Sequence, residues 1–184
     1  MTPERLQDII FASFSFHALQ EISWLCNILE KSKLKNVLEI GTAFGASLMV
    51  WDRLLEPDGT LVGMDVDSKM CVALQELIRK SHKNIKIILG DSQAPETIEK
   101  IKECFPGRII DFLFIDGWHS YEAIEQDYLN YGPLVRPGGI IAIHDIMHFD
   151  TGVGPFWKDL KMKESLQIEE FKDHNGVGVI HVEK

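Results

Sequence analysis

The stretch from Val37 to Gly45 restricts the fold more than any other part of the sequence. It is a short apolar run that ends at Gly41, followed by a loop that closes on a second glycine, Gly45. Glycine tolerates left-handed backbone angles and lets backbone N–H groups approach a ligand with no Cβ atom in the way. The next segment, Ala46 to Leu55, has the apolar spacing of a helix. The stretch therefore predicts a buried strand, a glycine loop and a helix N-terminus, the order in which doubly wound folds hold nucleotides.

The loop alone leaves two interpretations open, because any α/β protein needs a glycine where a strand turns into a helix. Its pattern is not the G-x-G-x-x-G of a dinucleotide site, since Gly41, Ala43 and Gly45 give G-x-A-x-G. A second feature is Asp65, which ends the apolar run Thr60 to Met64 about 20 residues after the loop. A carboxylate can accept two hydrogen bonds from a vicinal diol. Asp65 is therefore the expected ligand of a ribose.

Apolar runs alternate with helical patterns along most of the chain, and Asp67 is expected to cap one of the helices. The expected strands are Val37–Ile40, Thr60–Met64, Ile85–Leu89, Ile109–Ile115 and Ile140–Ile143, and the expected helices are Ser15–Lys31, Ala46–Leu55, Ser68–Ser81, Pro95–Glu103, Tyr121–Leu134 and one within 152–163. Such alternation predicts a mostly parallel sheet with helices on both faces. Asn175-Gly176, between the runs Leu166–Phe171 and Val177–Val182, is a hairpin signal. The sheet is therefore expected to end in an antiparallel pair, and Arg136 to Gly139 is expected to be a turn.

Polar residues follow each of the later expected strands. They are Gly90-Asp91-Ser92, Asp116-Gly117-Trp118-His119 and His144-Asp145. The carboxyl ends of parallel strands share one edge of the sheet, and ligands bind outside that edge in such folds. We therefore expect these side chains to meet Asp65 and the glycine loop at one site.

The 184 residues are enough for one domain, which we divide into an N-terminal helical cap (1–35) and a core (36–184). Thr2-Pro3 is a helix start. The aromatic residues Phe11, Phe14 and Phe16 either cover the sheet or line the pocket. The helical arm could also dock on a second copy of the chain in a homodimer.

Charge and cysteine usage restrict the partners and the compartment. The formal charge of −9 and the absence of Lys and Arg clusters argue against nucleic acid and favour a small-molecule acceptor. Cys26, Cys71 and Cys104 are odd in number and lack CxxC spacing, which predicts structural thiols in a reduced, cytoplasmic setting. No leader pattern and no apolar run of membrane-spanning length occurs, so no membrane association is expected.

Together these residues resemble the class I S-adenosylmethionine-dependent methyltransferases over nearly the whole chain from Asn36 onward. The segment Glu39 to Ser47 resembles the first motif of the family, Asp65 its ribose-binding acid and Gly90-Asp91-Ser92 its adenine-side motif. The resemblance implies a three-layer doubly wound sandwich with a seven-stranded sheet whose last two strands form the hairpin. Ile115 to Glu122, with Gly138-Gly139 and His144-Asp145, is similar to a subgroup of small-molecule O-methyltransferases and to cephalosporin hydroxylase-like proteins.

The resemblance also implies roles for individual residues. The loop backbone and the Ser47 hydroxyl would hold the methionine half of S-adenosyl-L-methionine, with Asp65 on the ribose and Asp91 and Ser92 beside the adenine. Glu39 would either contact the cofactor or orient the loop from below. The full set of expected cofactor residues is Glu39, Gly41, Thr42, Ala43, Phe44, Gly45, Ser47, Asp65, Val66, Asp91, Ser92, Asp116, Gly117 and Trp118.

Many members of the subgroup bind a divalent metal, and here Asp116, His144 and Asp145 match the ligand positions. His144 departs from the pattern because an acidic residue is common there. Magnesium, manganese and zinc are the candidates, and a mixed imidazole and carboxylate set suits manganese, zinc or iron better than magnesium. Without a metal, His119 or His144 could act as general base beside Asp116. A third reading is that both histidines only bond loop backbone.

Two other functions are compatible with parts of this pattern. A nicotinamide-dependent oxidoreductase would share the glycine loop and Asp65, but it would need G-x-G-x-x-G and usually a substrate domain. A non-catalytic relative that binds the cofactor as a sensor or partner module is the other alternative, because the chain has no large insertion to enclose an acceptor. The main prediction is methyl transfer to a hydroxyl oxygen.

Overall fold

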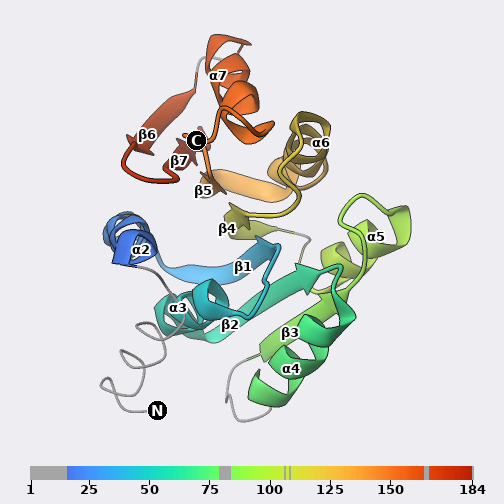
Figure 1. The fold of residues 1–184 in the computed structure, drawn as a ribbon. Coiled ribbons are helices and arrows are strands. Elements are labelled where there is room, and N and C mark those ends of the chain that lie inside the picture. Colours follow the sequence, from blue (N-terminus) through green and yellow to red (C-terminus); the bar gives the residue numbers. More distant parts are fainter. Residues whose placement is uncertain (1–15, 79–83, 106, 108, 164–165, 184) are drawn as a thin grey trace.

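The structure is a computed structural model, and it describes residues 16–78, 84–105, 107, 109–163 and 166–183. Helices and strands alternate along the chain, as Figure 1 shows. The elements are α2 (Phe16–Leu29), β1 (Leu34–Ile40), α3 (Ala46–Leu54), β2 (Leu55–Asp65), α4 (Ser68–Ile78), β3 (Asn84–Leu89), α5 (Pro95–Glu103), β4 (Ile110–Ile115), α6 (Tyr121–Tyr131), the 3₁₀ helix η2 (Gly132–Leu134), β5 (Val135–His144), α7 (Val153–Lys163), β6 (Gln167–Phe171) and β7 (Val177–His181).

The seven strands form one sheet in the order β3-β2-β1-β4-β5-β7-β6. Strands β1 to β5 are parallel, and β7 lies antiparallel between β5 and β6. From β1 the chain moves outward to β2 and β3, then returns to the other side of β1 as β4. The order therefore reverses between β1 and β4, which is where ligands bind in open α/β sheets. The predicted fold class, including the terminal hairpin, is confirmed.

Alternate residues of the central strands face two separate cores, which makes the fold a three-layer sandwich. On one face, Val37 of β1 and Phe112 and Phe114 of β4 pack with Trp51 of α3 and with α2. On the other face, side chains of β1 and β4 pack against α5, α6 and α7. Because both faces are covered, every residue of β4 is buried, and all of them except Asp111 are apolar.

Several boundaries differ from the sequence-based expectation. The predicted turn at 136–139 lies inside β5, because Val135 already pairs with Ile110 before a shift in register. Strand β2 likewise begins at Leu55, ahead of its predicted start. The helix expected to reach Leu134 ends at Tyr131 and continues as the 3₁₀ helix η2. Short pairings next to bulges carry no apolar periodicity, so sequence patterns miss them.

Part of the predicted N-terminal cap falls outside the described residues, namely Thr2-Pro3, Phe11 and Phe14. Within the described part, α2 places Ile22, Leu25 and Leu29 in the core it shares with α3. All three cysteines are free. Among the residues that the structure covers, no helix has both the length and the apolar character that crossing a membrane requires.

Candidate functional site

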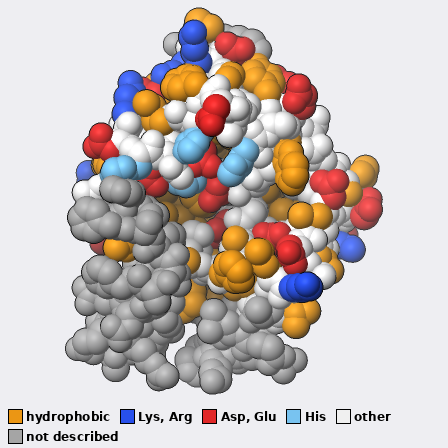
Figure 2. All heavy atoms as spheres, in the orientation of Figure 1, with side chains coloured by type: hydrophobic (Ala, Val, Ile, Leu, Met, Phe, Trp, Pro, Cys, Tyr) orange, Lys and Arg blue, Asp and Glu red, His pale blue; other side chains and the backbone are white. Residues whose placement is uncertain are grey.

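A cleft of about 770 Å³ lies outside the carboxyl ends of β1 to β4. Most of the predicted site residues that line it come from the loops after these strands: Gly41, Ala43, Asp65, Val66, Asp91, Ser92, Asp116, Gly117, Trp118 and His119. On the face drawn in Figure 2, histidine and acidic side chains gather near this rim. The strand ends therefore bring together residues that are up to 78 positions apart in the sequence, from Gly41 to His119.

Gly41 sits at the point of closest approach between the loops that follow β1 and β4. Its φ is +83°, and a Cβ atom there would lie 2.1 Å from the backbone oxygen of Asp116. The Gly41 N–H donates to the carbonyl of Met64 at 2.9 Å, and the N–H of Asp116 donates to the carbonyl of Ile40 at 2.9 Å. The glycine is required by both backbone angle and space, because any side chain would push the two loops apart.

Glu39 and Ser47 lie beneath the glycine loop and do not line the cleft. Glu39 is fully buried, and the Ser47 hydroxyl donates a hydrogen bond to its carboxylate. Burial raises the pKa of Glu39 to about 8, and the Ser47 hydrogen bond only partly opposes this rise. The pair therefore links the end of β1 to the first turn of α3, and Glu39 does not line the cleft.

Asp65 and Asp67, at the end of β2, have different hydrogen-bonding roles. Asp67 accepts hydrogen bonds from the N–H groups of Lys69 at 2.8 Å and Met70 at 3.4 Å, so it caps α4 as predicted. The Asp65 carboxylate accepts from the Ala43 N–H at 2.8 Å and from the Asp67 N–H at 2.9 Å. Asp65 thus ties the glycine loop to β2 while its side chain stays at the wall of the cleft.

Two residues of α6, Tyr131 and Asp127, support the wall of the cleft on the β3 side, and no sequence motif predicts this role. The Tyr131 hydroxyl donates to the Ser92 carbonyl at 2.7 Å. Asp127 is 1% exposed and lies next to Ser92, and its Oδ1 has no hydrogen-bond partner among the described residues. Burial raises the pKa of Asp127 to about 6, and repulsion from Asp91 adds to this, against a hydrogen bond with Ser92.

Two histidines and two aspartates meet beside the cleft, whose lining includes Asp116 and His119 but not His144 or Asp145. His144 Nδ1 lies 3.2 Å from Asp116 Oδ1 and 3.2 Å from Asp145 Oδ1. His119 Nε2 lies 3.2 Å from Asp145 Oδ2 and 3.7 Å from Asp116 Oδ1. Asp145 adopts a left-handed φ of 63°. The structure thus brings all four predicted catalytic and metal-binding residues together.

A fifth member of this cluster, Glu21, comes from the N-terminal helix α2. Its side chain is 2% exposed, and its Oε2 lies 3.0 Å from His144 Nε2. Its Oε1 accepts from the N–H groups of Asn175 at 2.9 Å and Gly176 at 2.8 Å. Nothing in the local sequence marks Glu21, because its partners lie more than 120 residues away.

The carboxylates around His144 decide its charge. Burial lowers the pKa of the imidazole, but the bonds to Asp116 and Glu21 outweigh burial and raise the pKa to about 11. Burial likewise opposes ionisation of Asp116, and the contacts with His119 and His144 hold its pKa below the usual range. The bond to Asp116 raises the pKa of His119. As described, His144 is an imidazolium with both nitrogens engaged, so it has no free lone pair with which to accept a proton.

The cluster also has the donor set of a metal site. One ligand atom from each of Asp116, His144 and Asp145 lies within 4.8 Å of the others, and His119 is not part of this set. Asp145 Oδ1 is buried and accepts no hydrogen bond from the described residues, so its closest cationic neighbour among them is His144 Nδ1 at 3.2 Å. A cation would satisfy that oxygen, so the residues fit a divalent metal. Binding would replace the proton on His144 Nδ1, because a ligating imidazole nitrogen is deprotonated.

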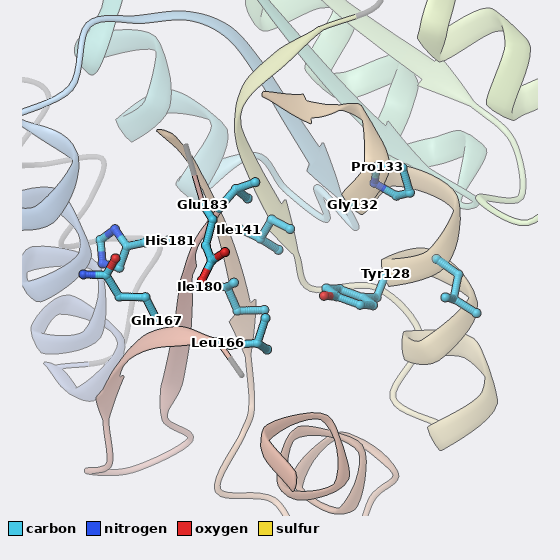
Figure 3. A pocket seen from close by; sticks show the side chains of 11 residues that line it. Tyr128, Gly132, Pro133, Ile141, Leu166, Gln167, Ile180, His181 and Glu183 are labelled. Atoms are coloured by element: carbon cyan, nitrogen blue, oxygen red, sulfur yellow. The ribbon is translucent and has the colours of Figure 1, made fainter. Parts of the chain in front are cut away.

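The remaining predicted cofactor residues do not line the cleft. Thr42 is buried under the loop, Gly45 is the residue before α3 with φ +78°, and the Phe44 side chain is 77% exposed. A second cavity of about 550 Å³ lies elsewhere, between the end of α6 and the β6–β7 hairpin (Figure 3). Its walls hold apolar side chains such as Leu166 and Ile180 and none of the predicted site residues.

Comparison with known proteins gives a match over the region that builds this site. A protein-family model described as a methyltransferase domain matches residues 38–146. Catechol O-methyltransferase B of Danio rerio is 23% identical over 150 residues, which are 82% of this chain and 56% of that protein. Caffeoyl-CoA O-methyltransferase of Medicago sativa is 29% identical over 140 residues, covering 73% and 54% of the two chains. The chain thus spans a little over half the length of these curated relatives.

The fold is shared with solved structures. The O-methyltransferase TomG from Streptomyces achromogenes, crystallised in complex with SAM, superposes with a TM-score of 0.73 at 19% identity. The match covers 100% of this chain and 92% of TomG. At this level of identity the likeness concerns the arrangement of the helices and strands.

Proposed function

The chain belongs to the methyltransferase domain family, and from this we propose that it transfers a methyl group from S-adenosyl-L-methionine to a hydroxyl oxygen of a small-molecule acceptor. One observation carries the proposal. Gly41, Asp65, Asp91 and Asp116 follow four different strands and line a single cleft. Its volume, about 770 Å³, lies within the range of small-molecule sites.

The positions of the wall residues support the placement of the cofactor. Asp65 lies beside the glycine loop, where a ribose diol would meet its carboxylate, and Asp91 and Ser92 lie on the β3 side, where the adenine would lie. The sulfonium of the cofactor carries a fixed positive charge. A cleft lined by Asp65, Asp91 and Asp116 in a chain of formal charge −9 favours that charge electrostatically.

The reaction requires alignment and removal of one proton. The new O–C bond forms as the S–C bond breaks, the hydroxyl proton passes to a base, and S-adenosylhomocysteine is the second product. His119 is the proposed base, because it lines the cleft and half of its side chain is exposed, whereas His144 is enclosed by carboxylates. Asp116 and Asp145 hold the His119 ring through its Nε2 atom.

Asp116, His144 and Asp145 are the proposed ligands of a divalent metal. When bound there, a metal lowers the pKa of a coordinated hydroxyl and orients it. The names of the Danio rerio and Medicago sativa relatives, a catechol and a caffeoyl-CoA O-methyltransferase, support a hydroxyl acceptor of low molecular mass. The absence of any cluster of Lys and Arg in the sequence agrees with a partner other than nucleic acid.

Methyl transfer from tritiated S-adenosyl-L-methionine to a panel of hydroxylated metabolites, with and without a chelator, tests the proposal. We expect labelled ether products from at least one aromatic or sugar hydroxyl, and lower yield with chelator. Replacing His119 by Gln should reduce kcat much more than KM if the ring removes the proton. Cofactor binding with no labelled product from any acceptor would instead indicate a non-catalytic binding module.

A further inference from the structure

Glu21 lies deeper in the site than its place on an N-terminal helix suggests. It extends from α2 to His144 and to the turn between β6 and β7, and its two carboxylate oxygens have different partners. Oε1 accepts from the backbone N–H groups of Asn175 and Gly176, and Oε2 faces His144 Nε2 at 3.0 Å. The carboxylate is therefore held from one side by the hairpin loop and presented to His144 on the other.

This arrangement determines which ring nitrogen of His144 carries a proton when only one does. An ionised carboxylate is only an acceptor, so His144 Nε2 must donate to Glu21 Oε2. The lone pair of Nδ1 is then directed at Asp116 Oδ1 and Asp145 Oδ1, each 3.2 Å away. Those two oxygens cannot donate, so this lone pair must be taken by a cation: the second proton of the imidazolium in the metal-free site, or a metal ion that replaces that proton.

We propose that Glu21 is a positioning residue that fixes His144 with its proton on Nε2, so that Nδ1 completes a divalent-metal site with Asp116 and Asp145. The inference rests on the metal-assisted form of the proposed function. Its second support is the buried Asp145 Oδ1, which has no hydrogen-bond partner among the described residues and faces the same point. A carboxylate behind a ligating histidine fixes the tautomer and raises the basicity of the ring.

The variant Glu21→Gln separates this role from simple anchoring of the hairpin loop. The amide oxygen of the substituted side chain can still accept from the N–H groups of Asn175 and Gly176. Its NH₂ group then faces His144 Nε2 and must donate to it, which moves the ring proton to Nδ1 and blocks the metal position. We therefore expect E21Q to fold and to lose about 10- to 100-fold in metal affinity, the usual cost of removing such an outer partner.

The experiment is a calorimetric titration of the full chain with Zn²⁺ and with Mn²⁺, for wild type, E21Q, and E170Q as the control. Glu170 is a carboxylate bonded to Trp157 and Lys161 and does not line the cleft, so E170Q should keep wild-type metal affinity. In the double mutant with His144→Asn, the E21Q effect should disappear, because Glu21 acts through the ring. An E21Q affinity within about twofold of wild type, or no metal binding by wild type, overturns the proposal.

Nitrogen NMR of the Zn²⁺-loaded wild type gives a readout that does not depend on the variant folding. We expect the His144 ring to show the proton on Nε2 and the metal on Nδ1, and the reverse attachment contradicts the role of Glu21. Titration with S-adenosylhomocysteine in the absence of metal is run on the same sample. Its failure counts against methyl transfer from S-adenosyl-L-methionine, whereas metal failure with intact cofactor binding counts against the metal site and this inference but not against methyl transfer.

Discussion

The buried carboxylate of Asp127 gives a stability prediction whose size follows from its pKa. Asp127 lies behind Ser92 and is 1% exposed. Its pKa is raised from an ordinary value of 3.8 to about 6, chiefly by burial. One pKa unit is worth about 1.36 kcal/mol, so the shift corresponds to about 3 kcal/mol of free energy of unfolding.

The direction follows from which state gives up the proton first. Because the folded-state pKa is raised, the contribution of protonated Asp127 is complete below about pH 4 and is lost as pH rises through about 6. Asn has the same shape and no charge to bury at any pH. We therefore expect the free energy of unfolding of Asp127→Asn, relative to wild type, to rise by about 3 kcal/mol between about pH 4 and about pH 8.

Urea denaturation followed by tryptophan fluorescence at several pH values measures this difference. The matched control is Asp173→Asn, because the side chain of Asp173 is exposed and forms no ion pair with another described residue, so its difference from wild type should change far less over the same pH range. The shape of the pH dependence matters more than the absolute offset, since the amide also changes a hydrogen bond to Ser92. A difference for D127N that is flat to within about 0.5 kcal/mol over this range would refute the reasoning.

Three further expectations concern Gly41, which lines the cleft, and two residues behind the lining, Glu39 and Tyr131. Gly41→Ala should destabilise the chain by several kcal/mol more than Gly107→Ala in urea denaturation. Both glycines have positive φ, but only the Cβ atom at residue 41 would meet backbone, at 2.1 Å. Equal losses of stability would contradict the close approach. Glu39→Gln should gain stability relative to wild type as pH rises from about 5 to about 8 and should change little further above about pH 9, because the pKa of Glu39 is raised from 4.5 in the unfolded chain to about 8 in the folded one. Tyr131→Phe should lose about 1 kcal/mol in the same assay, since it removes the 2.7 Å bond to the Ser92 carbonyl; no loss would show that the bond contributes nothing.

The fold and the meeting of the glycine loop with Asp65 and Asp91 in one cleft could be predicted because their signals are local. Apolar runs that end in Gly41, Asp65 and Asp91 mark strands and the loops that follow them, and parallel strands deliver those loops to one edge of a sheet. The Asn175-Gly176 turn likewise predicts the hairpin of β6 and β7. These features depend on residues that are neighbours in the sequence.

The parts that escaped prediction depend on contacts between distant segments. Glu21 on α2 and Asp127 on α6 read as ordinary helix residues, and only packing places them against His144 and Ser92. The direction of the Ser47 hydroxyl, toward Glu39 beneath the loop, is also a tertiary result. A sequence pattern identifies candidate site residues in the loops after the strands. Which helix side chains point toward those loops is known only once the helices are packed on the sheet.

Isothermal titration of the full chain with S-adenosylhomocysteine examines whether the strand ends form an adenosine-binding cleft. We expect one molecule bound per chain, with an affinity at least about tenfold weaker after Asp65→Asn, because the amide removes a charged acceptor from the cleft wall. Asp150→Asn should bind as wild type does, since that side chain does not line the cleft. No binding of S-adenosylhomocysteine by the folded wild-type chain, or binding that Asp65→Asn leaves unchanged, would contradict the placement of the cofactor.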